Sequence, residues 1–294
     1  MISICIPIFN FDTSALISEL KKQMESTQAG CELVLIDDHS DDHFRKIHRK
    51  YVGDCQYVEL EQNIGRSKIR NLFLRYATQP YFLFLDCDST VLDSKFLQNY
   101  LNQLSAEPNI VCGGRVYPTE KPEKSKMLRW KYGVLCESQP SHIRKLDPNK
   151  SFMTNNFLIK RELFDQIRFE ERLTQYGHED TLFGYELAKR GIQIEHIENP
   201  IMNGDIETNQ LFLEKTKLGI ENLKKLVQYV HNDPTLIQKV TLLKTYEKVR
   251  KFTSLLVPFF RVFNPLFYKL LQSGLHNITL FNIYKLGLLM MIKD

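Results

Sequence analysis

Long apolar runs that alternate with amphipathic segments limit the folds available to this chain more than any other feature. Residues 2–8, ISICIPI, and 32–38, ELVLIDD, each indicate a buried strand, and residues 13–26 between them repeat apolar side chains at helical spacing. The same pattern continues as strand, helix and strand at 56–61, 69–76 and 81–85. Strands with continuous apolar runs, joined by helices, predict an α/β fold with a mainly parallel sheet between helix layers.

The second half of the chain is expected to add short strands and then helices. The expected strands are 109–114, 151–159, which contains Asn155 and Asn156, and 192–197, which alternates like an edge strand. The expected helices are 176–191, 207–231 and 234–257. We therefore expect one α/β domain over residues 1–225 and a helical C-terminal extension over residues 226–294.

The net charge of +4 is small but unevenly distributed along the chain. Residues 214–294 contain 13 Lys and Arg against 5 Asp and Glu, whereas the preceding residues contain 26 against 30. A basic C-terminal part on a mildly acidic body indicates that this part meets an anionic surface. We expect no nucleic-acid binding, because the sequence holds neither an aromatic-interleaved basic motif nor a zinc-ligand spacing.

Residues 252–294 combine Phe, Leu and Tyr with a Lys or Arg every few positions. No uncharged run reaches the roughly 20 apolar residues that cross a bilayer. Pro258, Pro265 and Gly274 are expected to divide the segment into short pieces. Such a segment is typical of a helix that lies on a membrane surface. The alternative is a helical lid packed on the body of the protein or on a second copy, as in a homodimer.

The cysteines and the N-terminus indicate the compartment. The six cysteines are scattered, with no CxxC pair, which predicts buried and reduced thiols. The N-terminal MISICIPIFN lacks the basic start and long apolar core of a signal peptide. We therefore expect a cytoplasmic protein, bound peripherally to the inner face of the cytoplasmic membrane through residues 252–294.

Polar side chains follow three of the predicted strands at the points where these strands end. Asn10 follows the first strand, Asp37 and Asp38 end the second, and Asp86 and Asp88 follow the run FLFL. Because the carboxyl ends of parallel strands meet at one edge of a sheet, we expect these side chains to lie along that edge. Loops at such an edge commonly carry binding sites.

Each acidic pair has a functional and a structural interpretation. Asp86 and Asp88 could both reach one divalent cation, whose coordination the oxygens of a diphosphate would complete. The alternative is a polar turn that ends the strand. Asp37 and Asp38 could accept hydrogen bonds from a base or a ribose, or could form an Asx turn or a helix cap for the residues that follow.

A basic motif follows the third predicted strand. Asn63 and Gly65 precede Arg66, Lys68 and Arg70, so cations and backbone N–H groups would meet at a helix start, which attracts anions. The alternative is a solvated basic face of that helix.

An acidic motif, His178-Glu179-Asp180, precedes a later amphipathic run. A carboxylate at this place could act as a general base if it reached an acceptor hydroxyl. The alternative is that Asp180 is the N-cap of a helix over residues 181–189. Taken singly, neither this motif nor the others distinguishes between its two interpretations.

Taken in order, the motifs resemble those of family 2 glycosyltransferases with the GT-A fold. The matching stretches are SICIPIFN, LVLIDDHSDD, NIGRSKIRN, FLFLDCDS, TNNFLI and YGHEDTLFGYEL, within roughly residues 1–225. The last of these, with FNIYKLG near the C-terminus, is similar to bacterial members that build surface polysaccharides. The resemblance implies a transferase that moves a hexosyl or N-acetylhexosaminyl group from a UDP-sugar to a saccharide or a lipid-linked saccharide.

The resemblance also implies a nucleotide-sugar site. Pro7 and Asn10 match the loop that borders the nucleotide, Asp38 with Asp37 beside it matches the acid that reads the uracil, and Arg70 matches a basic residue near the donor. The remaining residues assigned to this site are Asn63, Gly65, Asp86 and Asn156.

The metal site and the base are implied in the same way. Asp86 and Asp88 match the DxD motif that holds Mn²⁺ or Mg²⁺ against the diphosphate, with Asp88 the more direct ligand. Glu179 and Asp180 match the acidic pair that supplies the catalytic base, and we expect Asp180 to be that base. The chain departs from the pattern at Asn203, which stands where related members often carry a His. Asn is a poorer metal ligand, so metal affinity or donor handling is expected to differ.

The sequence therefore predicts two alternative functions. The first is an inverting, metal-dependent glycosyltransferase of cell-surface polysaccharide synthesis, which both carboxylate pairs favour. The second is a catalytically inactive nucleotide-sugar-binding partner subunit, which the missing His favours.

Overall fold

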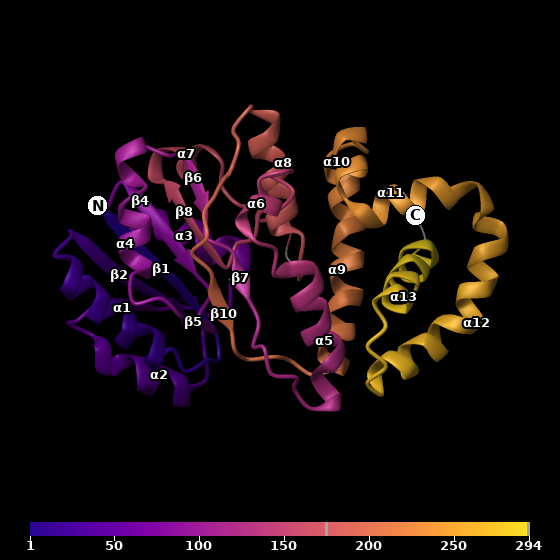
Figure 1. The fold of residues 1–294 in the computed structure, drawn as a ribbon, viewed down its shortest axis with the longest axis horizontal. Coiled ribbons are helices and arrows are strands. Elements are labelled where there is room, and N and C mark those ends of the chain that lie inside the picture. Colours follow the sequence, from indigo (N-terminus) through magenta and orange to yellow (C-terminus); the bar gives the residue numbers. More distant parts are fainter. Residues whose placement is uncertain (174–175, 293–294) are drawn as a thin grey trace. The chain divides into compact units, whose positions relative to one another are not determined.

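The structure is a computed structural model that describes residues 1–173 and 176–292 (Figure 1), and its chain divides into two compact units. The first unit comprises Met1–Tyr117, Ser138–Thr174 and Phe183–Asp205, and the second comprises Pro118–Glu137, Gln175–Leu182 and Ile206–Asp294. These units differ from the predicted division at residue 225, and the extent of the predicted catalytic domain stays a prediction.

A seven-stranded sheet, counted over the described residues, forms the centre of the first unit. Its strands are β1 (Ile2–Ile8), β2 (Cys31–Asp37), β3 (Gln56–Glu59), β4 (Tyr81–Leu85), β6 (Ile110–Cys112), β8 (Asn156–Lys160) and β9 (Glu195–His196). Their order is β3-β2-β1-β4-β8-β6-β9, and only β8 runs antiparallel to its neighbours. The prediction of an α/β fold with a mainly parallel sheet is confirmed.

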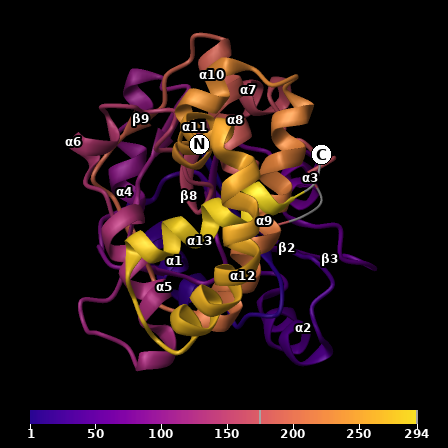
Figure 2. The same ribbon diagram turned by 90° about the vertical axis from the view of Figure 1, so that its right-hand side faces the viewer.

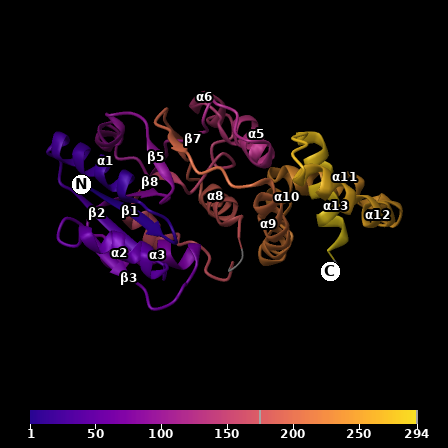
Figure 3. The same ribbon diagram turned by 90° about the horizontal axis from the view of Figure 1, so that it is seen from below.

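Helices cover both faces of this sheet. The helices of the first unit are α1 (Ser14–Thr27), α2 (Asp42–His48), α3 (Arg66–Tyr76), α4 (Phe96–Leu101), α6 (Ser141–Arg144) and α7 (Arg161–Gln166), and α8 (Glu179–Lys189) extends into this unit from residue 183. Apolar side chains of α1 and α4 pack on one face, and those of α3, α7 and α8 pack on the other. Figure 3 shows α1 and α3 on opposite sides of β1 and β2.

A second, smaller sheet lies within the first unit. It contains β5 (Ser89–Val91), β10 (Ile201–Asn203) and β7 (Arg115–Val116), in that order. β5 begins one residue after the second aspartate of the predicted metal pair, and β10 ends at Asn203. This sheet therefore joins stretches of chain that are distant in sequence beside the end of β4.

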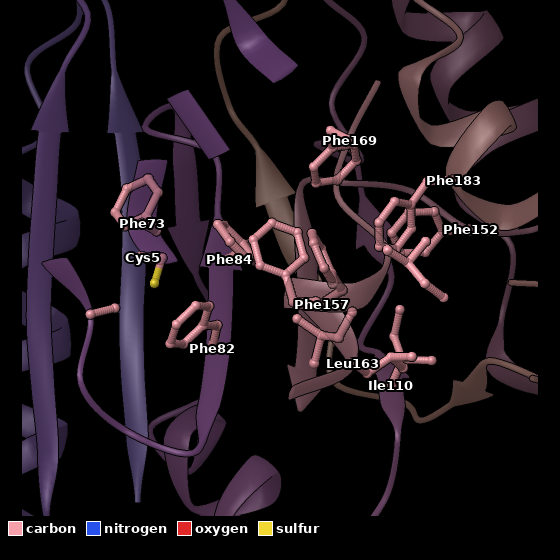
Figure 4. Close-up of a cluster of buried hydrophobic side chains, with 14 of the residues drawn as sticks. Cys5, Phe73, Phe82, Phe84, Ile110, Phe152, Phe157, Leu163, Phe169 and Phe183 are labelled. Carbon is pink, nitrogen blue, oxygen red and sulfur yellow. The ribbon is translucent and has the colours of Figure 1, made fainter. Parts of the chain in front are cut away.

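An aromatic cluster fills the core on the α3 face of the sheet (Figure 4). The Phe84 ring of β4 stacks on the Phe157 ring of β8 with 5.0 Å between centroids, and the rings of Phe169 and Phe183 stack at 4.5 Å. Buried aromatic pairs of this kind contribute about 0.5–1.5 kcal/mol each beyond the area that they bury. The carboxyl end of β4 and the amino end of β8, which lie side by side in antiparallel register, therefore rest on a layer of buried rings.

Four of the predicted strands are shorter in the structure. The run 109–114 keeps only Ile110–Cys112. The run 56–61 ends at Glu59 and the run 151–159 forms a strand only from Asn156. The run 192–197 keeps only Glu195–His196, although β9 does lie at the sheet edge as expected. The Ile192 N–H donates to the carbonyl of Leu187 in α8 at 3.0 Å, so this residue closes the helix instead of extending the strand.

The second unit is helical. Its helices are α5 (Met127–Tyr132), α9 (Asn209–Tyr229), α10 (Pro234–Lys239), α11 (Thr241–Val249), α12 (Thr253–Gln272) and α13 (Ile278–Met291), and it also holds the first turn of α8. Figure 2 shows α9, α12 and α13 side by side, and Phe281 and Tyr284 of α13 pack with Leu213 of α9 and Leu271 of α12 in one buried cluster. The long helix predicted at 207–231 is confirmed.

The prediction that prolines divide the C-terminal segment is wrong. Pro258 and Pro265 both lie inside the continuous helix α12, and only Gly274 follows a helix end. Each proline removes one backbone hydrogen bond from the helix. Tight packing on α13 compensates, because a Cβ added at Gly287 would come within 2.5 Å of Phe260 and of Asn264. Within the described residues, no helix is both long and apolar enough to span a bilayer.

The cysteines only partly follow the expectation. All six are free, in agreement with reduced thiols. Cys5 and Cys112 are buried within strands, but Cys136 is exposed and the other three are partly exposed. The expectation of buried thiols therefore holds for the two cysteines that lie in apolar strands.

Candidate active site

The loop after β2 is held by Asp37 and Asn10. Asp37 is fully buried, and its carboxylate accepts hydrogen bonds from the Ser40 N–H at 2.6 Å and the Tyr57 hydroxyl at 3.2 Å. The Asn10 side-chain oxygen accepts from the Asp41 N–H at 2.7 Å. Asn10 also has a φ of 48°, a conformation that Asn tolerates better than most residues. Asp37 therefore makes the local turn that the sequence left as an alternative.

Asp38 fixes the start of α3. Its carboxylate oxygens accept from the N–H groups of Ile64 at 2.7 Å and Gly65 at 3.0 Å, and its carbonyl accepts from the Asn63 side chain at 3.2 Å. Burial raises the pKa of Asp38, while the two backbone donors oppose that rise. Gly65 has a φ of 84°, which a residue without a side chain adopts readily. Asp38 thus ties α3 to the carboxyl edge of the sheet.

The two aspartates after β4 each have a polar partner. Arg70 of α3 is buried, and its Nη2 donates to Asp86 Oδ1 at 2.8 Å. Asn203 Nδ2 donates to Asp88 Oδ2 at 3.2 Å, because β10 and β5 pair with Asn203 opposite Ser89. Burial, followed by the nearby Asp86 charge, raises the pKa of Asp88. The two carboxylates therefore lie close enough to repel one another.

This arrangement of oxygen atoms fits a hard divalent cation. The Asp86 carboxylate already forms an ion pair with Arg70. That Asp88 is the more direct metal ligand stays a prediction. Within the described residues, no group of three or more His, Cys, Asp or Glu could hold a metal ion. A cation with six or more oxygen ligands at Asp88 would therefore need further oxygens from water or from a bound ligand such as a diphosphate.

Asn156 has a structural environment. It is fully buried, accepts from the Tyr100 hydroxyl at 2.7 Å, and donates to the carbonyls of Gly114 at 2.8 Å and Asn199 at 2.9 Å. A Cβ at Gly113 would lie 2.5 Å from the Asn156 amide nitrogen. Any residue other than glycine at position 113 would therefore clash with these hydrogen-bonded groups. The side chain of Asn156 is thus occupied within the protein, and its predicted contact with the donor stays a prediction.

Arg144 is a structural residue that the sequence did not reveal. It is 2% exposed and donates to the carbonyls of Cys112 at 3.1 Å, Gly113 at 3.0 Å and Ile197 at 2.7 Å. Its Nη1 also lies 2.7 Å from Nδ1 of His196, whose pKa burial lowers to about 4. Arg144 therefore joins the ends of β6 and β9 through their backbones. Its partners are scattered in sequence, so no local pattern could indicate this role.

The predicted base, Asp180, lies in the second unit. α8 begins at Glu179, so Asp180 lies in the first helical turn and is not the N-cap. Its Oδ1 accepts from the Thr181 N–H at 2.6 Å. His178 precedes the helix with a φ of 69°, and its Nδ1 lies 3.1 Å from Thr181 Oγ1. Burial lowers the pKa of His178 to about 4, so the imidazole is neutral at pH 7.

A lysine of α13 belongs to the same surroundings. Lys285 Nζ lies 5.1 Å from the ring centroid of Tyr132 and 4.8 Å from that of Phe281. Burial lowers the pKa of Lys285 to about 8, and its charge helps to lower the pKa of His178. The C-terminal helix thus contributes a cation near the His178–Asp180 motif.

The structure gathers most of the predicted nucleotide-sugar residues at the carboxyl edge of the first unit. The residues at this edge are Asn10, Asp37, Asp38, Asn63, Gly65, Arg70, Asp86 and Asp88, and Pro7 lies in β1 opposite Ile36. Glu179 and Asp180 belong to the second unit. Arg66 and Lys68 are exposed, in agreement with the alternative of a solvated basic face.

Comparison with known proteins places these motifs in a family. A family model described as glycosyl transferase family 2 matches residues 3–168. Chondroitin synthase of Pasteurella multocida is 25% identical over 223 residues, which cover 65% of this chain and 23% of that protein. Teichoic acid poly(glycerol phosphate) polymerase of Staphylococcus epidermidis is 26% identical over 151 residues, 49% of this chain and 20% of that protein. The chain thus spans less than a third of the length of these two relatives.

Solved structures share the fold. A mannosyltransferase of Pyrobaculum calidifontis, in complex with GDP-Man and Mn²⁺, aligns with a TM-score of 0.58 and 15% identity over 83% of this chain and 69% of that one. S. aureus TarS aligns with a TM-score of 0.54 and 18% identity over 97% of this chain and 54% of that one. At these identities the likeness shows the GT-A fold alone. The family model covers more than half of the chain, and the chain therefore belongs to glycosyl transferase family 2.

Proposed function

We propose that this glycosyltransferase is an inverting, metal-dependent enzyme that moves a sugar from a UDP-sugar to a saccharide or lipid-linked saccharide. The observation that carries the proposal is the turn after β4. There, two carboxylates lie close together, Asp86 with Arg70 and Asp88 with Asn203, at the edge that also holds Asp38. Burial, and after it the neighbouring Asp86, raises the pKa of Asp88, and adjacent acids of this kind are typical of a site completed by a cation and an anionic ligand.

Each residue has a separate task in this proposal. Asp88, with Asp86, would hold Mn²⁺ or Mg²⁺, and Arg70 would keep Asp86 oriented. When bound, the cation would supply positive charge that stabilises the departing diphosphate. Asp38 would orient the N–H groups at the start of α3 beside the nucleotide. Asp180 would accept the proton of the acceptor hydroxyl as its oxygen attacks the anomeric carbon. A single displacement of this kind inverts that carbon and would give a β-linkage from an α-linked donor.

The relatives support an acceptor of polymeric type. Two of the similar curated proteins are named a chondroitin synthase and a poly(glycerol phosphate) polymerase, and TarS has been solved in complex with UDP-GlcNAc. We propose a hexosyl or N-acetylhexosaminyl transfer to a cell-surface polysaccharide precursor on the cytoplasmic side. Because the chain spans only part of these relatives, this substrate class rests on the shared family and not on the whole protein.

Metal removal tests the proposed reaction. We expect the purified chain to release UDP from a UDP-sugar in the presence of Mn²⁺ and a saccharide acceptor, to stop in EDTA, and to recover when Mn²⁺ is restored. The release of UDP over a panel of UDP-sugars measures this directly. A chain that binds UDP but cleaves none of these donors with either Mn²⁺ or Mg²⁺ would instead be the inactive partner subunit.

We further propose that α12 lies on an anionic membrane surface. Apolar side chains one helical turn apart are exposed along one side of α12, while Phe260, Asn264 and Leu271 are buried on the other. The exposed apolar residues are Leu255, Phe259, Val262, Phe263, Leu266 and Leu270. No acid occurs between Glu247 and Asp294, whereas Lys251, Arg261 and Lys269 are exposed. An exposed apolar stripe flanked only by cations suits the interface of an anionic bilayer.

Charges placed on this stripe should abolish membrane binding. Leu255 and Val262 are 72% and 70% exposed, so Leu255→Glu with Val262→Glu is expected to leave the fold intact. Binding to vesicles that contain phosphatidylglycerol should weaken by about 100-fold or more, because two apolar groups of about 1.5–3 kcal/mol each are lost from the interface. Cosedimentation measures the change, with Leu218→Glu on α9 as a matched exposed control. Unchanged vesicle binding, or a concentration-dependent mass abolished by the double variant, would favour the lid or homodimer.

A further inference from the structure

Asn155 is a buried amide with no partner. Its side chain belongs to a residue that is 5% exposed, yet both the amide nitrogen and the amide oxygen lack a hydrogen-bond partner among the described residues. A buried polar group without a partner destabilises the folded protein. Such groups are rare in native proteins and commonly mark a place where a ligand or a bound water completes the bonding. The Asn155 amide therefore calls for an external partner.

The strand register places this amide beside the proposed metal site. β4 and β8 run antiparallel with Leu85 opposite Asn156, and the next pair is joined by the Asp86 N–H, which donates to the Asn155 carbonyl at 3.2 Å. Residues directly opposite on antiparallel strands project to the same face, with Cβ atoms about 4.5–5.5 Å apart. This register, continued by one pair beyond the two strands, places Asn155 directly opposite Asp86, whose carboxylate accepts from Arg70.

The neighbouring asparagine shows the opposite behaviour. Asn156, the first residue of β8, has its side chain bonded to the Tyr100 hydroxyl and to the carbonyls of Gly114 and Asn199. A second polar group at the same turn is also unsatisfied, since the buried hydroxyl of Ser89 has no partner among the described residues. Two of the buried side chains with unsatisfied polar atoms, Asn155 and Ser89, therefore adjoin the turn that carries Asp86 and Asp88.

The chemistry of the amide defines what it would bind. A primary amide offers two donors and a carbonyl acceptor, so its complement must both accept and donate within about 3 Å. A sugar hydroxyl, a pair of adjacent hydroxyls or an acetamido group meets this requirement, whereas a bare phosphate offers acceptors only. The neighbouring Asp86 carboxylate also accepts hydrogen bonds, and a sugar hydroxyl could donate one to it.

We propose that Asn155, and not Asn156, is a specificity-determining residue that hydrogen-bonds the sugar of the nucleotide-sugar donor. This inference rests on the proposed function for the identity of the ligand. Its site, however, follows from the orphaned amide and the register alone. The sequence shows Asn155 and Asn156 only as two adjacent asparagines. Their different hydrogen bonding becomes visible only when β8 pairs with β4.

A pair of leucine variants tests the assignment. Asn155→Leu removes an unsatisfied amide, so its melting temperature should equal or exceed that of the unchanged protein. Asn156→Leu breaks three hydrogen bonds and leaves buried partners unpaired, so its melting temperature should fall. Calorimetry then compares UDP with a UDP-sugar. In Asn155→Leu the affinity for UDP should be preserved, while the additional affinity conferred by the sugar and kcat/KM should fall about 10–100-fold.

Two results would overturn the assignment. If Asn155→Leu melts as early as Asn156→Leu, the amide serves the fold through a bound water. If it is stable but distinguishes UDP-sugar from UDP as well as the unchanged protein does, the amide does not contact the sugar. The proposed function fails separately, when the unchanged protein neither binds nor cleaves any UDP-sugar. Asn155→Ser, which retains a smaller donor and acceptor, should recover part of the lost affinity.

Discussion

Asp180→Asn is expected to lower kcat for sugar transfer by about 10²–10⁴-fold, the contribution of a positioned general base. Asparagine has the same shape and can still accept the Thr181 N–H bond at the start of α8, but it cannot take up the acceptor proton. The melting temperature and the affinity for UDP should therefore remain unchanged. Steady-state release of UDP with and without acceptor measures the loss.

Glu179→Gln is the matched control for this variant, because Glu179 lies in the same helical turn. A smaller loss in Glu179→Gln than in Asp180→Asn assigns the base to Asp180. The reverse order would assign it to Glu179, and full activity in both variants would remove the α8 carboxylates from the proton transfer.

Asp88→Asn should reduce transfer by about 10³-fold or more, because the loss of a metal-binding carboxylate forfeits several kcal/mol of charge stabilisation. The amide oxygen can still accept from Asn203, so the turn should keep its conformation. Calorimetric titration with Mn²⁺ should show weakened binding together with the lost activity. Asp93→Asn, an exposed aspartate near the same turn, is the control that should change neither.

Asp88→Asn should stabilise the metal-free protein although it lowers activity. Burial and Asp86 raise the pKa of Asp88, so the ionised carboxylate destabilises the fold at neutral pH. That penalty is absent below the unfolded pKa of about 3.9 and develops as the pH rises through the raised folded value. Without metal, Asp88→Asn should therefore melt at a higher temperature at pH 7. A lower melting temperature would indicate that Asp88 stabilises the turn by itself.

Local patterns predicted the framework of the site. The apolar runs that became β1, β2 and β4 end in the polar residues that meet at one edge, because parallel strands place their carboxyl ends together. The order of the motifs along the chain also predicted the family. The sequence could not predict the different partners of Asp37 and Asp38. Asp37 accepts from the local turn at Ser40, whereas Asp38 accepts from Ile64, 26 residues away.

The remaining features depend on contacts between distant segments. Asn203 donates to Asp88 across 115 residues of sequence, and Arg144 donates to carbonyls from two separate stretches, residues 112–113 and residue 197. The placement of Asn155 opposite Asp86 depends on the pairing of β8 with β4. The helix α12 persists through two prolines because it packs on α13, a tertiary effect that outweighs local propensity.

The division of the chain into two units has a practical and an evolutionary consequence. The backbone passes between the units five times, at residues 117, 137, 174, 182 and 205. No single cut can therefore release both units whole: a fragment that ends at residue 205 keeps all of the first but strips the second of its last and longest segment. Neither unit could have been acquired or exchanged by joining one gene segment end to end with another. A protease that nicks one crossing would leave two fragments that still depend on each other's segments.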